Sequence, residues 1–353
     1  MPDWTKSMQQ TYEYYEVDPG TWQNKRLLTD VSSASIVRDL SNDSLGSASI
    51  SVPYDYGELY IRTYLVATQN HIVDKTALGT HLFQTTTQSH DGKVDSIGLD
   101  GYTPLIELKE TMPPLGYSIG SGTNILTAVA SIVREHVRAP VVPGKDGAVL
   151  SAPFVADIDD TWFTYLSDLL ASASYRFDLD EDGRILFAPL QDFNSLQPVW
   201  IYTDDNSSIL YPDIDLDRDL YGVPNVMEVV YSRSNGVKLF SRVVNDDPNS
   251  PISTVNRGRE VVSRITDPKL NGEPTQYILD AYARQALRDA STLEHTLKYS
   301  HGYCPVRLGD CVLLNYKRAG FNSVKAKVIR QSINCETGCK VEETAVYTTS
   351  LWG

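Results

Sequence analysis

The sequence predicts a mainly β protein in which a small α+β insert separates two strand-rich regions. The chain has 353 residues, about twice the length of an ordinary domain, so two or three hydrophobic cores are expected. Runs of β-branched and aromatic residues, divided by turn residues, fill the first hundred residues and return after about residue 202. Two amphipathic helical patterns lie between these regions. The predicted domains are residues 1–109, 110–200 and 201–353.

The first region reads as strands and turns. Residues 59–66 (LYIRTYLV) are rich in β-branched and aromatic side chains, and residues 47–52 alternate more weakly. Residues 81–87 and 93–102 flank the dipeptide Asp91-Gly92, which is typical of a hairpin turn. We therefore expect an antiparallel sheet or barrel. One face of the first of these strands carries Leu59, Ile61 and Leu65.

The first helix of the insert is predicted to begin after Thr123 or Asn124, either of which can cap it, and to run to about Val137. Its apolar residues recur at helical spacing and form one stripe. These residues are Ile125, Leu126, Val129, Ile132 and Val133. Pro140 and Pro143 end the pattern.

The second helix is predicted to begin after Asp159 or Asp160, which would cap it. Its apolar stripe repeats the same spacing: Trp162, Phe163, Leu166, Leu169, Leu170 and Ala173. Residues 175–177 and 185–187 then read as two strands around an acidic turn, so a hairpin is expected there.

The last region is predicted to contain strands and one long helix. The strands share a β-branched composition and cover residues 226–231, 237–244, 311–316, 324–333 and 341–347. Pro274 suits the first turn of the helix. The side chains expected to be buried along that helix are Ile278, Ala281, Ala286, Leu287 and Ala290.

Composition excludes several classes of protein. Lys and Arg total 31 against 45 Asp and Glu, so the net charge is −14, and such a surface repels nucleic-acid phosphates. The hydrophobic fraction of 41% excludes general disorder. No apolar run approaches the roughly 18 residues that a membrane-spanning helix needs, and the N-terminus does not read as a secretory signal, so folding in a cytosol is expected. The acidity serves solubility, or it keeps one surface from binding a polyanion that passes along it.

Two short motifs in the insert have chemical interpretations. Residues 116–120 (GYSIG) fit the G-x-S-x-G pattern of a serine nucleophile, with Ser118 as the nucleophile. Met112-Pro113-Pro114 stands where that motif needs a buried strand, so a flexible entry to the helix is the preferred interpretation. Residues 120–124 (GSGTN) open the helix and suit an anion on its N-terminus, but they lack the lysine of a phosphate-binding loop. Capping is therefore preferred.

The acidic run from Asp178 to Asp182 begins like a calcium loop of the D-x-D-x-D-G type. A helix–loop–helix calcium site needs a glutamate at its twelfth position, where this chain has Pro189. The flanking strand-like residues favour a hairpin turn with Asp182-Gly183 at its tip. Calcium remains the alternative, because carboxylates on one turn repel each other.

The cysteines and histidines show no familiar metal-site spacing. Cys304, Cys311, Cys335 and Cys339 give C-x6-C and C-x3-C spacings, whereas common zinc ribbons have C-x2-C pairs. Buried free thiols or a late disulfide are preferred, and a metal or iron–sulfur site that uses all four is the alternative. The six histidines are scattered: His71, His81, His90, His136, His295 and His301. We therefore expect no catalytic, cofactor-binding or metal-binding residues, no cofactor and no enzymatic activity.

Several segments resemble the baseplate-hub, or tail-tip hub, proteins of tailed bacteriophages. They are residues 78–83 (LGTHLF), 90–94 (HDGKV), 101–108 (GYTPLIEL), 124–136, 160–162 (DTW), 182–187 (DGRILF) and 306–312 (VRLGDCV). The resemblance covers most of the chain loosely, and its motifs reflect turns and packing. The four C-terminal cysteines depart from the family's core pattern.

The resemblance implies two β-barrel domains related to the tail-tube fold, on either side of an α+β insert. It implies a homotrimeric ring with pseudo-sixfold symmetry, which joins the tail tube to the central spike or tip. The implied partners are the tail tube or distal tail protein, the spike or tip protein, the tape measure protein, and genomic DNA in passage through the lumen. The implied location is the virion tail, assembled in the host cytoplasm, with no insertion of this chain into a membrane.

Two other functions stay open at this point. A tail-associated cell-wall hydrolase would use Ser118 or a pair of carboxylates, and it predicts a pocket with a histidine within hydrogen-bond reach of Ser118. A host-receptor or carbohydrate-binding module predicts an exposed cluster of aromatics drawn from Trp4, Trp22, Trp162, Trp200 and Trp352. Trp162 is expected in the core instead, because it lies on a helical apolar stripe.

Overall fold

A computed structural model describes residues 2–90, 92, 95–144, 148–191, 193–233, 236–268 and 274–352. Strands hold 46% of the residues and helices 15%, so the prediction of a mainly β protein is confirmed. Contacts divide the chain into two compact units. The first comprises Met1–Ile214 with Tyr299–Thr344, and the second Asp215–Lys298 with Ala345–Gly353. The division into domains 1–109, 110–200 and 201–353 stays a prediction.

The first unit is built on one large sheet. Its N-terminal strands are β1 (Gln9–Val17), β2 (Asn24–Leu28), β3 (Ser33–Asp39), β4 (Gly46–Val52), β5 (Leu59–Gln69), β6 (Ile72–His90) and β7 (Asp95–Tyr102). Its later strands are β12 (Pro198–Thr203), β13 (Leu210–Arg218), β17 (Thr292–Gly302), β18 (Cys311–Asn315), β19 (Val324–Asn334) and β20 (Lys340–Ser350). Three of these, β13, β17 and β20, also carry the chain between the two units. A short 3-10 helix, η2 (Lys317–Ala319), follows β18.

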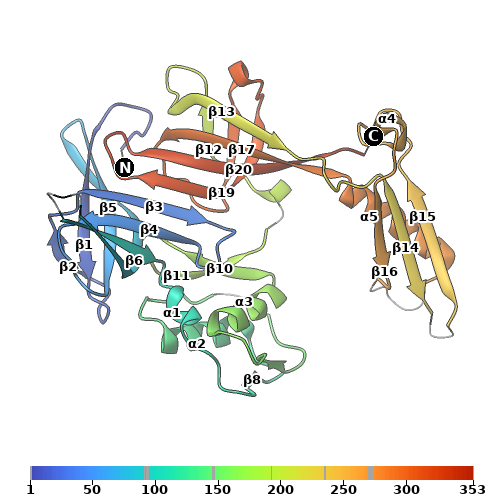
Figure 1. Cartoon of the computed structure of the whole chain (residues 1–353), viewed down its shortest axis with the longest axis horizontal. Helices are drawn as coiled ribbons and strands as arrows, with labels where there is room; N and C mark the ends of the chain where they lie inside the picture. Colours follow the sequence, from blue (N-terminus) through green and yellow to red (C-terminus); the bar gives the residue numbers. More distant parts are fainter. Residues whose placement is uncertain are drawn as a thin grey trace. The chain divides into compact units, whose positions relative to one another are not determined.

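The order of these strands places strands from the last part of the chain beside strands from the first part. Among the described residues it is β13-β17-β20-β19-β3-β4-β7-β6-β5-β1-β2, with β18 beside β19 and β12 beside β18. Antiparallel pairing of β19 with β3 joins the C-terminal strands to the N-terminal ones, which Figure 1 shows as red strands beside blue ones. The hydrophobic clusters among the described residues of this unit include one on the side of the insert and one between the N-terminal strands and the end of β19.

The predicted N-terminal strands are present. Residues 59–66 lie in β5, 47–52 in β4 and 81–87 in β6, and β6 pairs with β7 as an antiparallel hairpin. Its predicted turn residue Asp91 lies outside the described residues, as do Lys93 and Val94. Strand β5 is buried on both faces, because Ile61 packs into the N-terminal core while Tyr60 packs toward the insert.

The described residues of the insert form three helices and two short strand pairs. They are α1 (Ile106–Lys109), α2 (Ile125–His136), α3 (Trp162–Ser172), β8 (Ser118–Ile119) with β9 (Phe154–Val155), and β10 (Tyr175–Leu179) with β11 (Ile185–Pro189). A 3-10 helix, η1 (Phe193–Ser195), precedes β12. Helices α2 and α3 bury the predicted stripes in one core, to which the first β region contributes Trp22, Tyr60 and Leu82.

The residues that cap these helices can be compared with the predicted caps. Asn124 caps α2, since its side chain accepts a hydrogen bond from the backbone N–H of Thr127. The prediction that Asp159 or Asp160 caps α3 is wrong. Thr161 caps it, in a reciprocal box with Thr164, because its hydroxyl lies one turn from the Thr164 backbone N–H. Asp160 instead accepts a hydrogen bond from the Thr164 hydroxyl.

The second unit is a three-stranded sheet packed against one helix. Strand β14 (Val226–Ser232) pairs antiparallel with β15 (Lys238–Val244) and parallel with β16 (Val262–Thr266). A short helix, α4 (Thr254–Arg257), precedes β16, and α5 (Gln276–Ala290) covers one face of the sheet. Figure 1 shows α5 beside β14 to β16.

The predicted helix 274–290 is present as α5, but its buried face is shifted by one residue. The buried side chains are Leu279, Ala283 and Leu287, while Ile278 and Ala281 are exposed and Ala286 and Ala290 are half-buried. Two apolar stripes about 100° apart run along this helix, and the sheet selects the one that carries both leucines. Pro274 lies before the cap residue Thr275 and not in the first turn.

Candidate functional site

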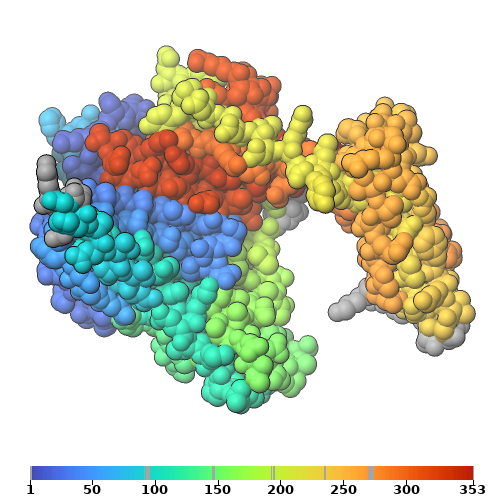
Figure 2. Space-filling model, viewed as in Figure 1, coloured from blue at the N-terminus to red at the C-terminus, as the bar shows by residue number. Residues whose placement is uncertain are grey.

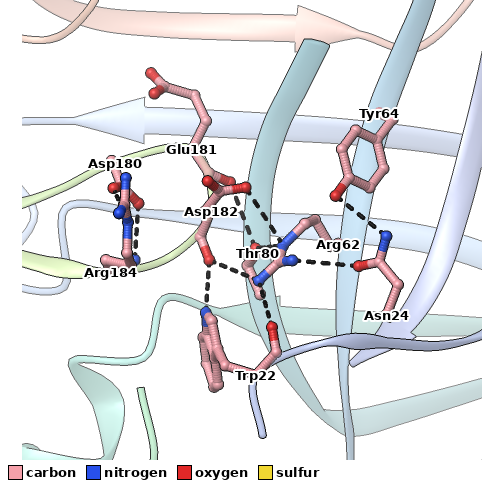
Figure 3. Close-up of polar contacts among 9 residues, drawn as sticks. All are labelled: Trp22, Asn24, Arg62, Tyr64, Thr80, Asp180, Glu181, Asp182 and Arg184. Atoms are coloured by element: carbon pink, nitrogen blue, oxygen red, sulfur yellow. Dashed lines mark hydrogen bonds and ion pairs between the residues drawn. The ribbon is translucent and has the colours of Figure 1, made fainter. Parts of the chain in front are cut away.

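The acidic run that suggested calcium forms the tip of hairpin β10–β11, as the flanking strands predict. The backbone N–H of Gly183 donates to the carbonyl of Asp180, which closes the turn. Gly183 has a φ of +76°, and a Cβ there would come within 2.7 Å of the Thr80 side chain. Glycine is therefore required both for the turn and for its close approach to β6. Figure 3 shows the tip seated against residues of the first β region.

The main chain of the tip is held by two buried side chains of that region. The indole N–H of Trp22 donates to the carbonyl of Asp182 at 2.8 Å. The Arg62 Nη2 donates to the same carbonyl at 3.0 Å, and its Nε donates to the Thr80 hydroxyl at 2.9 Å (Figure 3). Arg62 is only 6% exposed, so these contacts are largely shielded from water. We call Trp22, Arg62 and Thr80 the hairpin seat.

The carboxylates of the tip are each paired with a guanidinium group. Asp180 Oδ2 lies 2.6 Å from Arg184 Nε, and Glu181 Oε1 lies 2.9 Å from Arg307 Nε and 3.9 Å from Arg38. Asp182 lies 3.8 Å from Arg62. Within the described residues no three His, Cys, Asp or Glu side chains are grouped as a metal site requires. Calcium was the alternative because carboxylates on one turn repel each other. In this structure the arginine partners offset that repulsion.

A second polar cluster is buried in the sheet of the first unit. Glu343 on β20 is 1% exposed, and it accepts hydrogen bonds from the hydroxyls of Tyr299 and Tyr202 and from the side-chain amide of Gln331. His301 Nε2 lies 3.4 Å from Glu343 Oε2, the oxygen that accepts from Gln331, whereas both tyrosines donate to Oε1. We call these five residues the Glu343 network. Four strands, β12, β17, β19 and β20, meet through it.

Burial and pairing act against each other in this network. Burial raises the pKa of Glu343, but the hydrogen bonds and charge of His301 and the bonds from Tyr299 and Gln331 outweigh it, so the net pKa is lowered. Burial likewise lowers the pKa of His301, and its contacts with Cys304 and Glu343 outweigh that effect and raise it to about 10. At neutral pH Glu343 is therefore a carboxylate and His301 an imidazolium, and the two buried charges have opposite signs.

The pair predicts a dependence of stability on alkaline pH. Because the folded pKa of His301 is raised from 6.5 to about 10, its contribution is complete below pH 6.5 and is lost as the pH rises through about 10. The expected loss is a few kcal/mol, since one pKa unit corresponds to about 1.4 kcal/mol. The check is urea unfolding across this range for the wild type and for the uncharged double variant H301Q/E343Q. The prediction would be contradicted if the free energy of unfolding fell by the same amount in both proteins over this pH range.

Ser118 does not lie in the setting of a catalytic serine. It is exposed on β8, seven residues before α2 begins, so it occupies no strand-to-helix elbow. Among the described residues no histidine donates to or accepts from its hydroxyl. The preferred capping interpretation of residues 120–124 agrees with the cap bond of Asn124.

The four cysteines are buried free thiols, as preferred from their spacing. Burial raises the pKa of Cys335 to about 12 and of Cys339 to about 11, which makes both poor nucleophiles and poor metal ligands. Cys304 lies beside His301, with Sγ 3.8 Å from Nδ1. His136, the last residue of α2, packs against Trp162 with the ring centroids 4.7 Å apart and the ring planes tilted by 31°.

The tryptophans do not form the exposed cluster that a receptor-binding module predicts. Trp22 and Trp162 are buried, the latter as expected, and Trp4, Trp200 and Trp352 are half-buried. Three of them contact different residues: Trp4 packs against Tyr303, Trp22 packs against Tyr60, and Trp352 lies under the guanidinium of Arg288.

The residues that hold these clusters were not predicted from the sequence. Arg62 is a charged residue inside the otherwise apolar strand LYIRTYLV, and that interruption was a usable signal of a buried contact. Tyr202, His301 and Glu343 are far apart in the sequence, and no local pattern links them.

No helix of the described part of the chain has the length and hydropathy needed to cross a bilayer.

Comparisons with known proteins identify the fold. No protein-family model matches the sequence, and no curated protein is similar to it. In structure, the chain is similar to a tail protein from Neisseria meningitidis MC58, with a TM-score of 0.63, 13% identity, and 97% of this chain and 98% of that chain covered. It is also similar to the 43 kDa tail protein of prophage MuSo2 from Shewanella oneidensis, with a TM-score of 0.60, 10% identity and coverage of 95% and 98%.

A third similar structure is the Francisella PdpA–VgrG complex in its half-lidded form, with a TM-score of 0.59 and 7% identity. The match covers 98% of this chain and 58% of that chain. The chain therefore has the fold of tail proteins along nearly its whole length, and the family resemblance read from the sequence holds at the level of the fold.

Proposed function

We propose that this protein is a structural hub at the end of a phage tail. Three copies form a ring with pseudo-sixfold symmetry, in which two barrel-like β regions of each copy resemble the tail tube. The ring joins the tube to the central spike or tip. The observation that carries this proposal is the likeness to two tail proteins over at least 95% of this chain and 98% of each of theirs.

Open sheet edges support assembly with neighbours. Among the described strands, β2, β12 and β13 each have one strand neighbour. An unpaired edge exposes backbone donors and acceptors and invites pairing with another chain. Strand β12 adds exposed apolar side chains, since Val199 is 55% and Ile201 is 56% exposed. Neighbouring copies would cover such edges in a closed ring.

The proposed partners follow from this role. They are the tail tube or distal tail protein, the spike or tip protein and the tape measure protein, all within the virion tail after assembly in the host cytoplasm. Genomic DNA passes through the lumen without capture, because a net charge of −14 repels its phosphates. The role is geometric and requires no cofactor, catalytic residue or membrane insertion.

The mass of the purified protein in solution tests the proposal. A closed ring of three chains has a mass of about 118 kDa, three times the 39.3 kDa of one chain. Sedimentation velocity at increasing concentration is expected to converge on that value. A species that stays monomeric and hydrolyses cell-wall material would contradict the hub role and favour the hydrolase.

A further inference from the structure

Two loops of the insert form a joined surface on the first unit. Strand β8 pairs with β9, with Ser118 opposite Val155. The backbone N–H of Ala156 then donates to the carbonyl of Tyr117, and that of Trp162 donates to the carbonyl of Thr111. Residues 111–118 and 155–162 therefore run side by side in opposite directions. We call them the insert-loop surface, and Figure 2 shows the insert, coloured teal to light green, at the outside of the molecule.

This surface exposes large apolar side chains. Leu115 is 84% and Ile158 is 75% exposed, and both lie midway between the linked ends of the two segments. Met112 and Val155 are also more than half exposed. Such a concentration on two adjoining loops is unusual for a surface that stays in water. Tyr117 of one segment packs edge-on against Trp162 of the other, with the ring centroids 4.9 Å apart, so an aromatic contact also links the two segments.

The charged residues within the two segments are all negative: Asp157, Asp159 and Asp160. Residues 110–133 and 148–175 contain no Lys or Arg, and Lys109 comes just before the first segment, with its Nζ 5.6 Å from the Phe163 ring. Asp157 and Asp159 are exposed on either side of Ile158. A partner that covers the apolar residues must therefore also tolerate or neutralise acidic charge.

A second apolar surface, with the opposite charge, lies on the sheet of the same unit. Ile201 on β12 pairs with Leu313 on β18, which pairs with Lys325 on β19, so these three side chains share one face. Val199, at the β-bulge between Pro198 and Trp200, is exposed close to Ile201 in the chain, and Lys317 follows β18 in η2. We call this the β12 surface.

Basic residues lie on and beside the β12 surface. Residues 311–335 hold five basic residues and no acidic one: Lys317, Arg318, Lys325, Lys327 and Arg330. Arg330 is paired with Asp39, and Asp204, which follows β12, accepts a hydrogen bond from the backbone N–H of Arg318, so the positive charge of this surface is assigned to Lys317 and Lys325. Figure 1 draws β8 and β12 at opposite ends of the first unit, with hairpin β10–β11 between them. One end of the unit thus carries apolar residues with negative charge, and the other carries apolar residues with positive charge.

We propose that the insert-loop surface of one copy binds the β12 surface of the next copy. This inference rests on the proposed trimer and names the contact that builds it. Each surface placed against its own kind would bring like charges together, which disfavours a two-fold contact. A contact between two different surfaces repeats from copy to copy, and it gives a ring when the rotation closes.

Charge reversal with rescue tests the contact. The variants are D157K/D159K on the insert-loop surface and K317E/K325E on the β12 surface, and their association is measured by sedimentation equilibrium. Each reversal alone is expected to raise the dissociation constant of the assembly by at least about tenfold, because it opposes like charges across the contact. Combining both reversals in one chain is expected to restore the wild-type value to within about threefold.

A matched control for the insert-loop variant is D246K/E294K, which makes the same change in net charge as D157K/D159K at exposed positions of the second unit. It is expected to associate as the wild type does. An assembly that forms but ignores both reversals, or one that fails to recover when they are combined, overturns this contact and leaves the trimer standing. A wild type that never associates overturns the trimer itself. Unchanged circular dichroism spectra show that the variants are folded.

Discussion

Replacing Glu343 by alanine is expected to lower the free energy of unfolding by about 3–5 kcal/mol. The substitution leaves the imidazolium of His301 buried without its counter-charge, and it removes the acceptor of the Tyr299 hydroxyl and of the Gln331 amide. The unfolded chain regains full hydration for these groups, so the whole cost falls on the folded state. Urea unfolding at pH 7 measures the effect.

The neighbouring residue supplies the control. Glu342 stands next in the chain on the opposite face of β20, 56% exposed in its side chain and 2.9 Å from Lys340. Its replacement by alanine is expected to change the free energy of unfolding by at most about 0.5 kcal/mol, as for other solvent-exposed pairs. Equal effects of the two substitutions would show that the Glu343 network contributes no more than a surface ion pair.

Replacing Arg62 by alanine is expected to cost about 3 kcal/mol and to loosen hairpin β10–β11. Arg62 donates to the carbonyl of Asp182 and to the Thr80 hydroxyl, so its loss removes the donor to Thr80 and leaves the Asp182 carbonyl with the Trp22 indole as its donor. The amides of residues 175–189 are expected to exchange with deuterium faster than in the wild type, because the hairpin seat holds their turn. Exchange measured by mass spectrometry with urea unfolding checks both effects.

Two further variants separate the seat from general charge effects. Lysine at position 62 keeps the charge but offers one nitrogen where the guanidinium offers three, so it is expected to recover only part of the loss. Arg26, whose side chain is 56% exposed beside Glu16, is the matched arginine, and its replacement by alanine is expected to cost at most about 0.5 kcal/mol. Hairpin exchange that is the same in R62A and R26A would contradict the role of the seat.

Local patterns were sufficient for much of the fold. Apolar spacing located α2 and α3, and alternation with an acidic turn located hairpin β10–β11. These elements depend on contacts between residues close in the sequence, which periodicity records directly. The free cysteines followed from the expected compartment.

The remainder depends on contacts that no local pattern records. The sheet of the second unit determines which of the two apolar stripes of α5 is buried. Residues 215–298 form most of that unit, and no local pattern separates them from the rest of residues 201–353. The Glu343 network unites residues 202, 299, 301, 331 and 343, which periodicity cannot bring together. The hairpin seat was equally distant, since Trp22 and Asp182 are 160 positions apart.

The pairing of β3 with β19 has a consequence for biosynthesis. Ile36 lies opposite Ile333, so one side of β3 has no partner until nearly the whole chain has left the ribosome. At roughly 5–20 residues per second, translation leaves that edge open for about 15–60 seconds. During this interval the nascent N-terminal sheet presents a ready template for pairing with other nascent chains. Chaperone protection of the emerging chain would therefore matter most between the synthesis of its fourth strand and that of its nineteenth.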